Sequence, residues 1–437
     1  MATDFQEAVT GLQSDSKFRK SQVISVWMGQ CGGESLVAGR ILLLFENAKS
    51  LVLFGDCGQK SGELECNSSQ LVKEILQAVF HQPDLFQRSL MCCWFMIQPV
   101  SDIPVDSDAR SRQSAAEILC PELFRPMYDL IGDIHGCADE LVELLHKLDY
   151  SEESGVFRHA NRRVIFCGDF IDRGPRIRDV IQICRSMCQQ DAAMAVMGNH
   201  ELNALTFHSP NPLIPGEFLR RHTEHNIRQH QATLTQLDQR DLTDALSWFR
   251  TLPPSLELDG VRAVHACWDP TDLQVLNQVS TELGWMSDPF LVRAATRNDP
   301  VFRSIERTMK GPEMTLPNGL LVTDKEGTSR PTVRIRWFEM PEGRSCAAYA
   351  LPSEQYAELH QLTVPDNVQP CPYPHHAPPV FIGHYWLRDR KPAPLTNNVA
   401  CLDYSVAKDG LMTAYRFQGE STLCATRFVT VARKNPA

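Results

Sequence analysis

The chain has 437 residues, of which 43% are hydrophobic, so it can bury a large core and is expected to hold more than one domain. Its 43 Lys and Arg residues against 53 Asp and Glu residues give a net charge of -10, which disfavours non-specific binding to nucleic acid or to an anionic membrane. The 15 cysteines are scattered, form no CxxC pairs and follow no secretory leader, which indicates reduced thiols in a cytoplasmic protein.

Residues 1–100 are expected to form an N-terminal α/β region. Strand-like runs lie at 23–28, 41–45 and 51–54, and Leu71, Ile75, Leu76 and Val79 are spaced as one face of a helix. The apolar stretch from 41 to 54 is interrupted by charged and polar residues and is too short to span a bilayer of about 30 Å, so no membrane association is expected. This region carries no motif that assigns it a function, and the binding of a protein partner through residues 1–100 is one use that stays open. The polar residues 101–125 are interpreted as a linker.

From Tyr128 onward, short apolar runs alternate with helical patterns. The runs at 128–131, 164–167 and 193–197 are separated by segments with helical spacing, which predicts a βαβαβ unit with a largely parallel sheet and right-handed crossovers. Asp259-Gly260 between two further runs predicts a β-hairpin. We expect one domain over 126–434, closed by β structure, with 286–377 as an insertion that selects the substrate.

The predicted strands end in side chains that can bind a metal. The relevant stretches are Gly132-Asp133-Ile134-His135-Gly136, Gly168-Asp169-Phe170-Ile171-Asp172-Arg173-Gly174 and Gly198-Asn199-His200-Glu201. Open α/β sheets place ligands just beyond the carboxyl ends of their strands, so these side chains are expected at one edge. His265 and His384 follow two later apolar runs and add imidazoles to the set.

One aspartate is expected to bridge two metal ions. Asp133 and His135 are two residues apart, so in an extended chain they leave the same face, and Asp169 from the neighbouring strand supplies the third ligand. Asn199 adds a carbonyl oxygen. A mixed oxygen and nitrogen set suits two divalent transition metal ions, with Mn expected first and Fe or Zn as alternatives. Two such ions about 4 Å apart would generate a hydroxide and clamp phosphoryl oxygens.

The three stretches resemble the signature motifs of the calcineurin-like metallophosphoesterases, in the branch of the phosphoprotein phosphatases and bacterial diadenosine tetraphosphatases. The resemblance covers 128–417 and implies a four-layer α-β-β-α sandwich, here with the N-terminal α/β extension. By similarity, Asp133, His135 and Asp169 would bind one ion, and Asp169, Asn199, His265 and His384 the other. His200 would protonate the leaving oxygen while Asp172 orients its ring. Arg173 would hold the phosphoryl oxygens, which agrees with the bidentate fit of a guanidinium to phosphate.

The chain departs from this family pattern in ways that leave the substrate open. Alanine follows His265, and His384 lies in Gly-His-Tyr-Trp. Arg334 and Arg336 are candidate substrate-binding residues, and Trp337 beside them could stack on a nucleotide, although arginines that alternate along a strand are typical of a solvated face.

Each site residue, taken singly, could have a structural role instead of a catalytic or metal-binding one. Asp172 could cap the helix that begins near Pro175, Glu201 is expected to be structural, and His208, His222, His225 and His230 are expected at the surface. Taken together, the ligand-type residues favour a dinuclear-metal phosphoesterase that hydrolyses phosphate esters or anhydrides by attack of metal-bound hydroxide. The expected substrate is a phosphorylated protein, a nucleotide or a small phosphoester, as for a phosphomonoesterase or protein serine/threonine phosphatase. The alternatives are a dinucleoside polyphosphate hydrolase and, from another class, a catalytically silent module that binds phosphate or recruits a partner.

Overall fold

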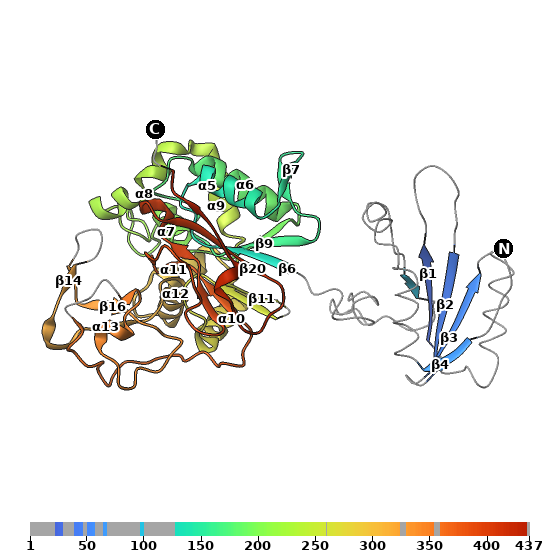
Figure 1. Cartoon of the computed structure of the whole chain (residues 1–437). Coiled ribbons are helices and arrows are strands. Elements are labelled where there is room, and N and C mark those ends of the chain that lie inside the picture. The colour runs from blue at the N-terminus through green and yellow to red at the C-terminus, as the bar shows by residue number, and fades with distance from the viewer. Residues whose placement is uncertain are drawn as a thin grey trace. The chain divides into compact units, whose positions relative to one another are not determined.

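The computed structural model describes five strands between Gln22 and Pro99 by their backbone, and residues 127–258, 260–323, 329–353 and 359–434 with their side chains. The chain divides into two compact units, Met1–Phe124 and Arg125–Ala437, and each is described by itself. Figure 1 shows the elements of both units.

The described part of the first unit is an antiparallel sheet with the strand order β4-β3-β2-β1-β5. Its strands are β1 (Gln22–Met28), β2 (Gly39–Glu46), β3 (Ser50–Asp56), β4 (Leu64–Asn67) and β5 (Ile97–Pro99). The predicted strands at 23–28, 41–45 and 51–54 are confirmed, and Glu46 pairs with Ser50 where β2 turns back into β3. The predicted helix with Leu71 and the predicted linker lie outside the described residues.

The second unit is built on a six-stranded sheet in the order β10-β9-β6-β20-β19, with β21 paired to β20. The strands are β6 (Met127–Ile131), β9 (Arg162–Phe166), β10 (Ala193–Ala195), β19 (Asp403–Tyr404), β20 (Leu411–Phe417) and β21 (Phe428–Ala432). The first three are parallel and are joined by α5 (Ala138–Lys147) and α6 (Ile177–Gln189), so the predicted βαβαβ unit is confirmed. A small hairpin, β7 (Ser151–Glu153) and β8 (Val156–Arg158), follows α5.

A second sheet has the order β11-β12-β17-β18. It consists of β11 (Ser255–Leu258), β12 (Val261–Val264), β17 (Val380–Ile382) and β18 (Val399–Cys401). The antiparallel pair β11 and β12 confirms the hairpin predicted from Gly260, whose φ of 78° is a conformation that glycine adopts without a steric penalty. The strands β12, β17 and β18 are parallel, so this sheet also has carboxyl ends that meet at one edge.

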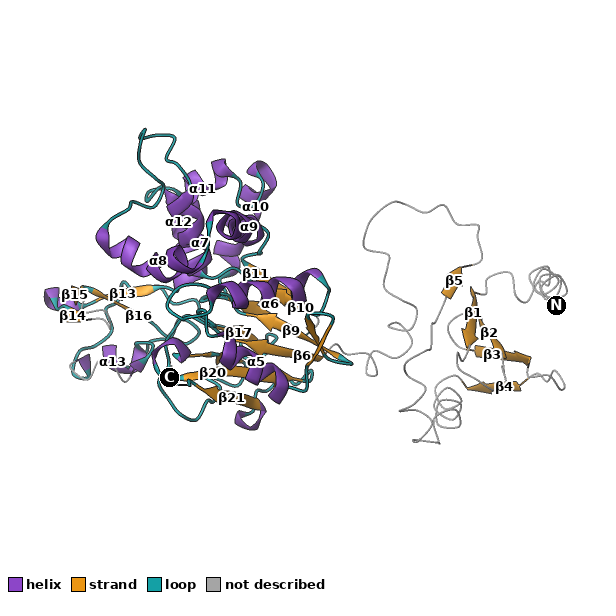
Figure 2. Ribbon diagram, turned by 90° about the horizontal axis from the view of Figure 1, so that it is seen from above, coloured by secondary structure: helices purple, strands orange, loops and turns teal. Residues whose placement is uncertain are grey.

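The two sheets pack face to face. Side chains that alternate along the strands, such as Leu130 and Ile165 from the first sheet and Ala263 and Phe381 from the second, form one buried cluster between them. The outer face of the first sheet is covered by α5 and α6, whose apolar stripes enter the largest core cluster (Figure 2). The helices and the two sheets are thus three layers, α, β and β, of the expected four-layer sandwich.

A group of helices lies at one end of the sandwich (Figure 2). They are α7 (Asn199–His208), α8 (Glu224–Gln236), α9 (Gln239–Phe249), α10 (Pro270–Leu283), α11 (Asp288–Ala295) and α12 (Pro300–Lys310). Several begin as the sequence dictates, because a Ser, Thr or Asp side chain caps the first turn: Thr223, Asp238, Asp269, Ser287 and Asp299. None of the helices in the described ranges is long and apolar enough to cross a membrane.

The segment predicted as an insertion divides between two cores. Its helices α11 and α12 join the largest cluster, whereas the residues after them pack on the outer face of the second sheet. The latter part contains β13 (Glu313–Thr315), β14 (Val322–Thr323), β15 (Ser329–Arg330), β16 (Thr332–Arg334) and α13 (Cys346–Tyr349). The fourth layer is therefore mostly short strands and loops.

Candidate metal centre

The predicted ligands converge from the ends of five strands. Asp133 and His135 follow β6, Asp169 follows β9, and Asn199 begins α7 just after β10; His265 and His384 follow β12 and β17. All six side chains are buried. The structure therefore brings the carboxyl ends of both sheets to a common point.

Asp169 lies between the histidines. Its Oδ2 is 3.6 Å from Nε2 of His135 and 3.9 Å from Nε2 of His200, and its Oδ1 is 3.4 Å from Nε2 of His265. Two groups of potential ligands share this aspartate, namely His135, Asp169 and His200, and Asp169, His265 and His384, with the ligand atoms of each group within 4.8 Å of one another. A residue that belongs to both groups is suited to bridge two ions.

The ring nitrogens of His135 and His265 that point away from Asp169 donate to backbone carbonyls. Nδ1 of His135 donates to the carbonyl of Ile171 at 2.9 Å, and Nδ1 of His265 donates to the carbonyl of Cys167 at 2.7 Å. In each neutral ring, Nε2 is then an acceptor. Among the described residues, Nε2 of His135 and Nε2 of His384 are buried without a hydrogen-bond partner. Buried acceptors that converge without a donor fit a cation.

The charges at the centre agree with metal binding. Burial and the neighbouring His200 lower the pKa of His135 to about 3, and burial with the positive charge of Arg334 lowers the pKa of His384, so both rings stay neutral. Burial and the nearby carboxylates of Asp403 and Asp169 raise the pKa of Asp133. Divalent ions would relieve this repulsion and need neutral imidazoles.

The backbone at the ligands is not the extended chain that the spacing of Asp133 and His135 suggested. Strand β6 ends at Ile131, and His135, Asp169 and His384 have φ values of 48°, 55° and 71°. Side chains rarely adopt this left-handed region, and such residues concentrate at functional sites. Asp133 and His135 still meet, with Oδ2 and Nε2 3.9 Å apart, but a turn brings them together.

Glu201 holds the centre together from behind. Its carboxylate accepts the backbone N–H groups of Asp169, Phe170 and Gly198 at 2.9, 2.9 and 3.0 Å. It therefore ties the loop after β9 to the start of α7. This role agrees with the structural part expected of it.

A second pair of residues lies beside the ligands. Nδ1 of His200 donates to Oδ2 of Asp172 at 2.5 Å, and both side chains are buried. Burial lowers the pKa of His200, but the carboxylates of Asp169 and Asp172 outweigh it and raise this pKa above its ordinary value. The N-cap of α6 is Arg176, so the competing interpretation of Asp172 as a helix cap is wrong.

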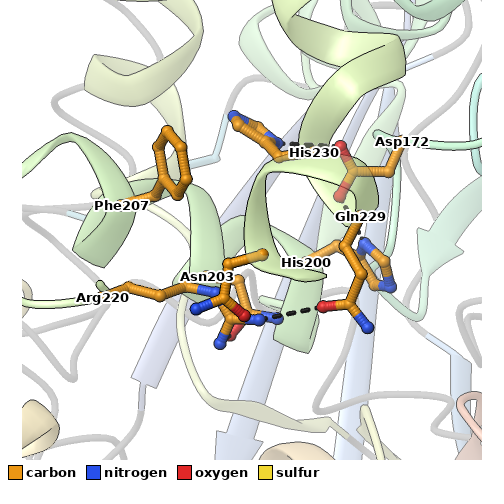
Figure 3. Close-up of a pocket in the computed structure, with 8 residues that line it drawn as sticks. Asp172, His200, Asn203, Phe207, Arg220, Gln229 and His230 are labelled. Carbon is orange, nitrogen blue, oxygen red and sulfur yellow. Dashed lines mark hydrogen bonds and ion pairs between the residues drawn. The ribbon is translucent and has the colours of Figure 1, made fainter. Parts of the chain in front are cut away.

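His230 was expected at the surface, and this prediction is wrong. The side chain is buried, and its Nδ1 donates to Oδ1 of Asp172 at 2.9 Å (Figure 3). Thr233 Oγ1 donates to the same oxygen at 2.5 Å. His230 and Thr233 are three residues apart on α8 and so share one face, which is the signal in the sequence that could have identified the pair. Nε2 of His230 lies 3.2 Å from Nε2 of His208.

Arg173 lies over an aromatic ring. Its guanidinium carbon is 4.2 Å from the centroid of Trp386, a residue that the motif analysis did not single out. The backbone N–H of Trp386 donates to Oδ2 of Asp403 at 2.7 Å. Asp403, at the start of β19, thus accepts a hydrogen bond from Trp386 and helps to raise the pKa of Asp133.

Arg334, Arg336 and Trp337, which the sequence suggested as substrate-binding residues, differ in their contacts. Arg334 donates to the carbonyl of Lys310 at 3.0 Å, and its charge acts on His384. Arg336 pairs with Glu339 at 2.6 Å. Trp337 is fully buried and donates to the carbonyl of Ala266 at 3.0 Å, which excludes the alternative that its ring stacks on a nucleotide.

Comparison with known proteins finds a family model that matches part of the chain. Residues 128–315 match the family model of the calcineurin-like phosphoesterases. The match places a calcineurin-like phosphoesterase domain at residues 128–315 of the chain. This family implies divalent metal ions, in agreement with the converging ligands.

Relatives of the phosphoesterase domain include bacterial tetraphosphatases. The chain is 32% identical over 132 residues to the asymmetrical bis(5'-nucleosyl)-tetraphosphatase PrpE of Bacillus velezensis, which covers 30% of this chain and 50% of that protein. It is 26% identical over 261 residues to the symmetrical bis(5'-nucleosyl)-tetraphosphatase of Shigella dysenteriae, covering 55% of this chain and 84% of that one. With the PrpE protein of Oceanobacillus iheyensis it shares 44% identity over 73 residues, which is 16% of this chain and spans 29% of that relative.

Among solved structures, the chain resembles a protein serine/threonine phosphatase from Saccharomyces cerevisiae that is itself described as similar to human phosphatase PP5. The TM-score is 0.37 at 11% identity, covering 74% of this chain and 82% of the yeast one.

Proposed function

We propose that the domain is a dinuclear-metal phosphoesterase that hydrolyses phosphate esters or anhydrides. The observation that carries the proposal is that Asp169 belongs to two groups of potential metal ligands, one with His135 and one with His265 and His384, while Nε2 of His135 and Nε2 of His384 are buried without a hydrogen-bond partner among the described residues. Asp133 and Asn199 complete the ligand set. Two divalent ions would supply activated water and would neutralise charge on the phosphoryl oxygens.

The chain's own residues account for the other requirements of the reaction. His200 would donate a proton to the leaving oxygen, and Asp172 would keep the ring oriented through the bond to Nδ1. Arg173, positioned over Trp386, would bind phosphoryl oxygens. Arg334 is a second candidate for this role, because it is close enough to His384 for its positive charge to lower the pKa of that ring. The pairing of Arg336 with Glu339 makes it the weaker candidate.

The oxygen and nitrogen ligands favour Mn as the metal, with Fe or Zn as alternatives. A phosphorylated protein or small phosphoester and a dinucleoside polyphosphate are both compatible substrates, and the tetraphosphatase relatives support the second. A catalytically silent module is disfavoured because the ligands and the His200–Asp172 pair are intact. Residues 1–100 are proposed as a region that recruits a protein partner, and the scattered cysteines support a cytoplasmic location.

The test combines metal analysis with the hydrolysis of an aryl phosphate by the full chain, with and without added Mn. The wild type is expected to bind about two transition metal ions and to turn over the ester. Asp169→Asn should lower both the metal content and the turnover. Asp191→Asn, at an exposed position near β10, is the matched control and should change neither. The absence of bound metal, together with unchanged turnover in Asp169→Asn, would rule out the enzyme.

A further inference from the structure

The loops that follow β17 and β19 are joined to each other beside the metal centre. The N–H of Leu387 donates to the carbonyl of Asp403 at 2.9 Å, and Oγ of Ser405 donates to the carbonyl of Leu387 at 3.0 Å. Farther along, the N–H of Ala393 donates to the hydroxyl oxygen of Tyr404 at 3.2 Å. The loop from Leu387 to Ala393 is therefore held at both ends against β19.

A lysine from the second of these loops reaches the edge of the metal centre. Lys408 ends the short 3-10 helix Val406–Lys408, and its Nζ lies 5.5 Å from the centroid of Trp386. The same ring carries the guanidinium of Arg173 at 4.2 Å and lies 5.7 Å from the ring of His135. The two cations are thus no farther apart than their two distances to the Trp386 centroid taken together.

Lys408 is accompanied by other exposed cations. The loop after β17 also carries exposed basic residues, namely Arg388, Arg390 and Lys391. Within the described residues, neither these side chains nor Lys408 form an ion pair, although Asp389 and Asp409 lie in the same loops. Cations without a carboxylate partner in the chain are available to an external anion. They gather here in a protein whose net charge is -10, against its overall charge.

We propose that Lys408 and the loop Arg388–Lys391 form a basic rim that binds acidic side chains beside the phosphorylated residue of a protein substrate. The inference rests on the proposed function, because Arg173 must hold the phosphoryl group for the rim to take this role. An extended peptide advances about 3.3 Å per residue, so a carboxylate two or three residues from the phosphorylated one would reach Lys408. Clusters of basic side chains recognise phosphorylated and acidic motifs in this way.

The distribution of charge favours a polypeptide over a nucleic acid on the basic rim. Asp389 and Asp409 interrupt the cations, and the chain as a whole is acidic. A nucleic acid presents an unbroken row of phosphates, which such a mixed surface would partly repel. A peptide with separate carboxylates can place them against the cations alone.

The test compares two phosphoserine peptides on the Mn-loaded full chain at low ionic strength. The peptides are identical except that one carries Glu, and the other Gln, at the second and third positions on both sides of the phosphoserine. The wild type is expected to favour the Glu peptide in kcat/KM by about 10-fold, mainly through KM. Lys408→Met should reduce this preference by about 3-fold, and the combined Arg388→Gln, Arg390→Gln and Lys391→Gln variant should reduce it as well. Lys408→Met should not change kcat/KM for an aryl phosphate, which has no carboxylate for the rim to bind.

Lys147→Met is the matched control. It removes the same charge from an exposed lysine at the end of α5, which runs away from the carboxyl ends of the strands, and it should leave the peptide preference unchanged. Raising the salt to about 0.5 M should weaken the preference of the wild type more than that of Lys408→Met, since salt screens interactions between exposed charges.

Equal kcat/KM values of the wild type for the two peptides, with the aryl phosphate hydrolysed, would overturn the inference and leave the proposed function standing. Stronger competitive inhibition by an oligonucleotide than by an unphosphorylated Glu peptide of the same charge would also overturn it, because the rim would then bind nucleic acid. Failure of the Mn-loaded wild type on every phosphate ester would instead reject the proposed function itself.

Discussion

Asp172 and His230 are joined by a hydrogen bond of 2.9 Å between Oδ1 and Nδ1, on the carboxylate oxygen opposite to the one that faces His200. Thr233 donates to Oδ1 as well, so α8 holds the carboxylate that orients the proposed acid. The imidazole of His200, the proposed acid, is thus positioned from a helix that carries none of the signature motifs.

Replacing His230 tests this positioning. His230→Ala should lower kcat for an aryl phosphate roughly tenfold with little change in KM, because the orientation of His200 relaxes while the phosphoryl grip remains. His230→Asn, whose amide can still donate, should recover part of the loss. His225→Ala on the same helix is the control, and a rise in KM without a fall in kcat would contradict the prediction.

The stacking of Arg173 on Trp386 predicts an effect on binding. In Trp386→Leu the guanidinium loses the ring beneath it, so KM for an aryl phosphate and the inhibition constant of inorganic phosphate should both rise by about 3- to 10-fold. Trp386→Phe keeps an aromatic face and should show a smaller rise. A variant with a reduced kcat and unchanged phosphate inhibition would show that the ring does not act through Arg173.

One buried ion pair is expected to contribute strongly to the stability of the six-stranded sheet of the second unit. Arg162 donates to Asp129 at 2.8 Å and to the carbonyls of Tyr128 and Phe417 at 2.6 and 2.8 Å. Arg162→Met leaves the carboxylate of Asp129 buried with Arg416 at 3.5 Å as its remaining cation. The free energy of unfolding in urea, followed by tryptophan fluorescence, should fall by about 3 kcal/mol.

Arg163 is the matched control for this measurement. It is the next residue in β9, but it pairs with the exposed Asp191. Arg163→Met should cost less than about 1 kcal/mol. Similar losses in the two variants would mean that the buried network does not dominate the stability of the sheet.

The stability of the protein is expected to depend on pH through the protonation of His208. Burial, with His230 and His222 nearby, lowers the pKa of His208 from its ordinary value of 6.5 to about 4. Between these values the unfolded chain binds a proton that the folded protein does not, so stability falls as the pH drops from 6.5 towards 4. His208→Gln should reduce the loss of unfolding free energy between about pH 7 and pH 5 by roughly 1 kcal/mol, allowing for solvent screening. An unchanged difference would assign the acid sensitivity to other groups.

The sequence predicted those parts of the centre that depend on local patterns. Apolar runs that end in Asp133, Asp169 and Asn199 define parallel strands, and parallel strands bring their carboxyl ends together. His384 was reached by the same logic, because it follows an apolar strand. These residues could be found without knowing any contact between distant parts of the chain.

The rest depends on tertiary packing. His230 lies on α8 and Trp386 in the loop after β17, and the positions of both depend on partners elsewhere in the chain, Asp172 and Asp403. For Trp337 the sequence suggested a binding role that the structure does not support. A tryptophan beside two arginines resembles part of a binding surface, but its burial in the core cannot be read from the sequence.

The hydrogen bond from the backbone N–H of His384 to Asp133, at 3.1 Å, joins residues 251 positions apart. A ribosome therefore releases the first ligands long before it synthesises the last. During that interval the βαβαβ unit can form, but the ligand set remains incomplete. If the proposed centre binds metal, the complete ligand set, and with it the proposed hydrolysis, would form only after nearly the whole domain has left the ribosome.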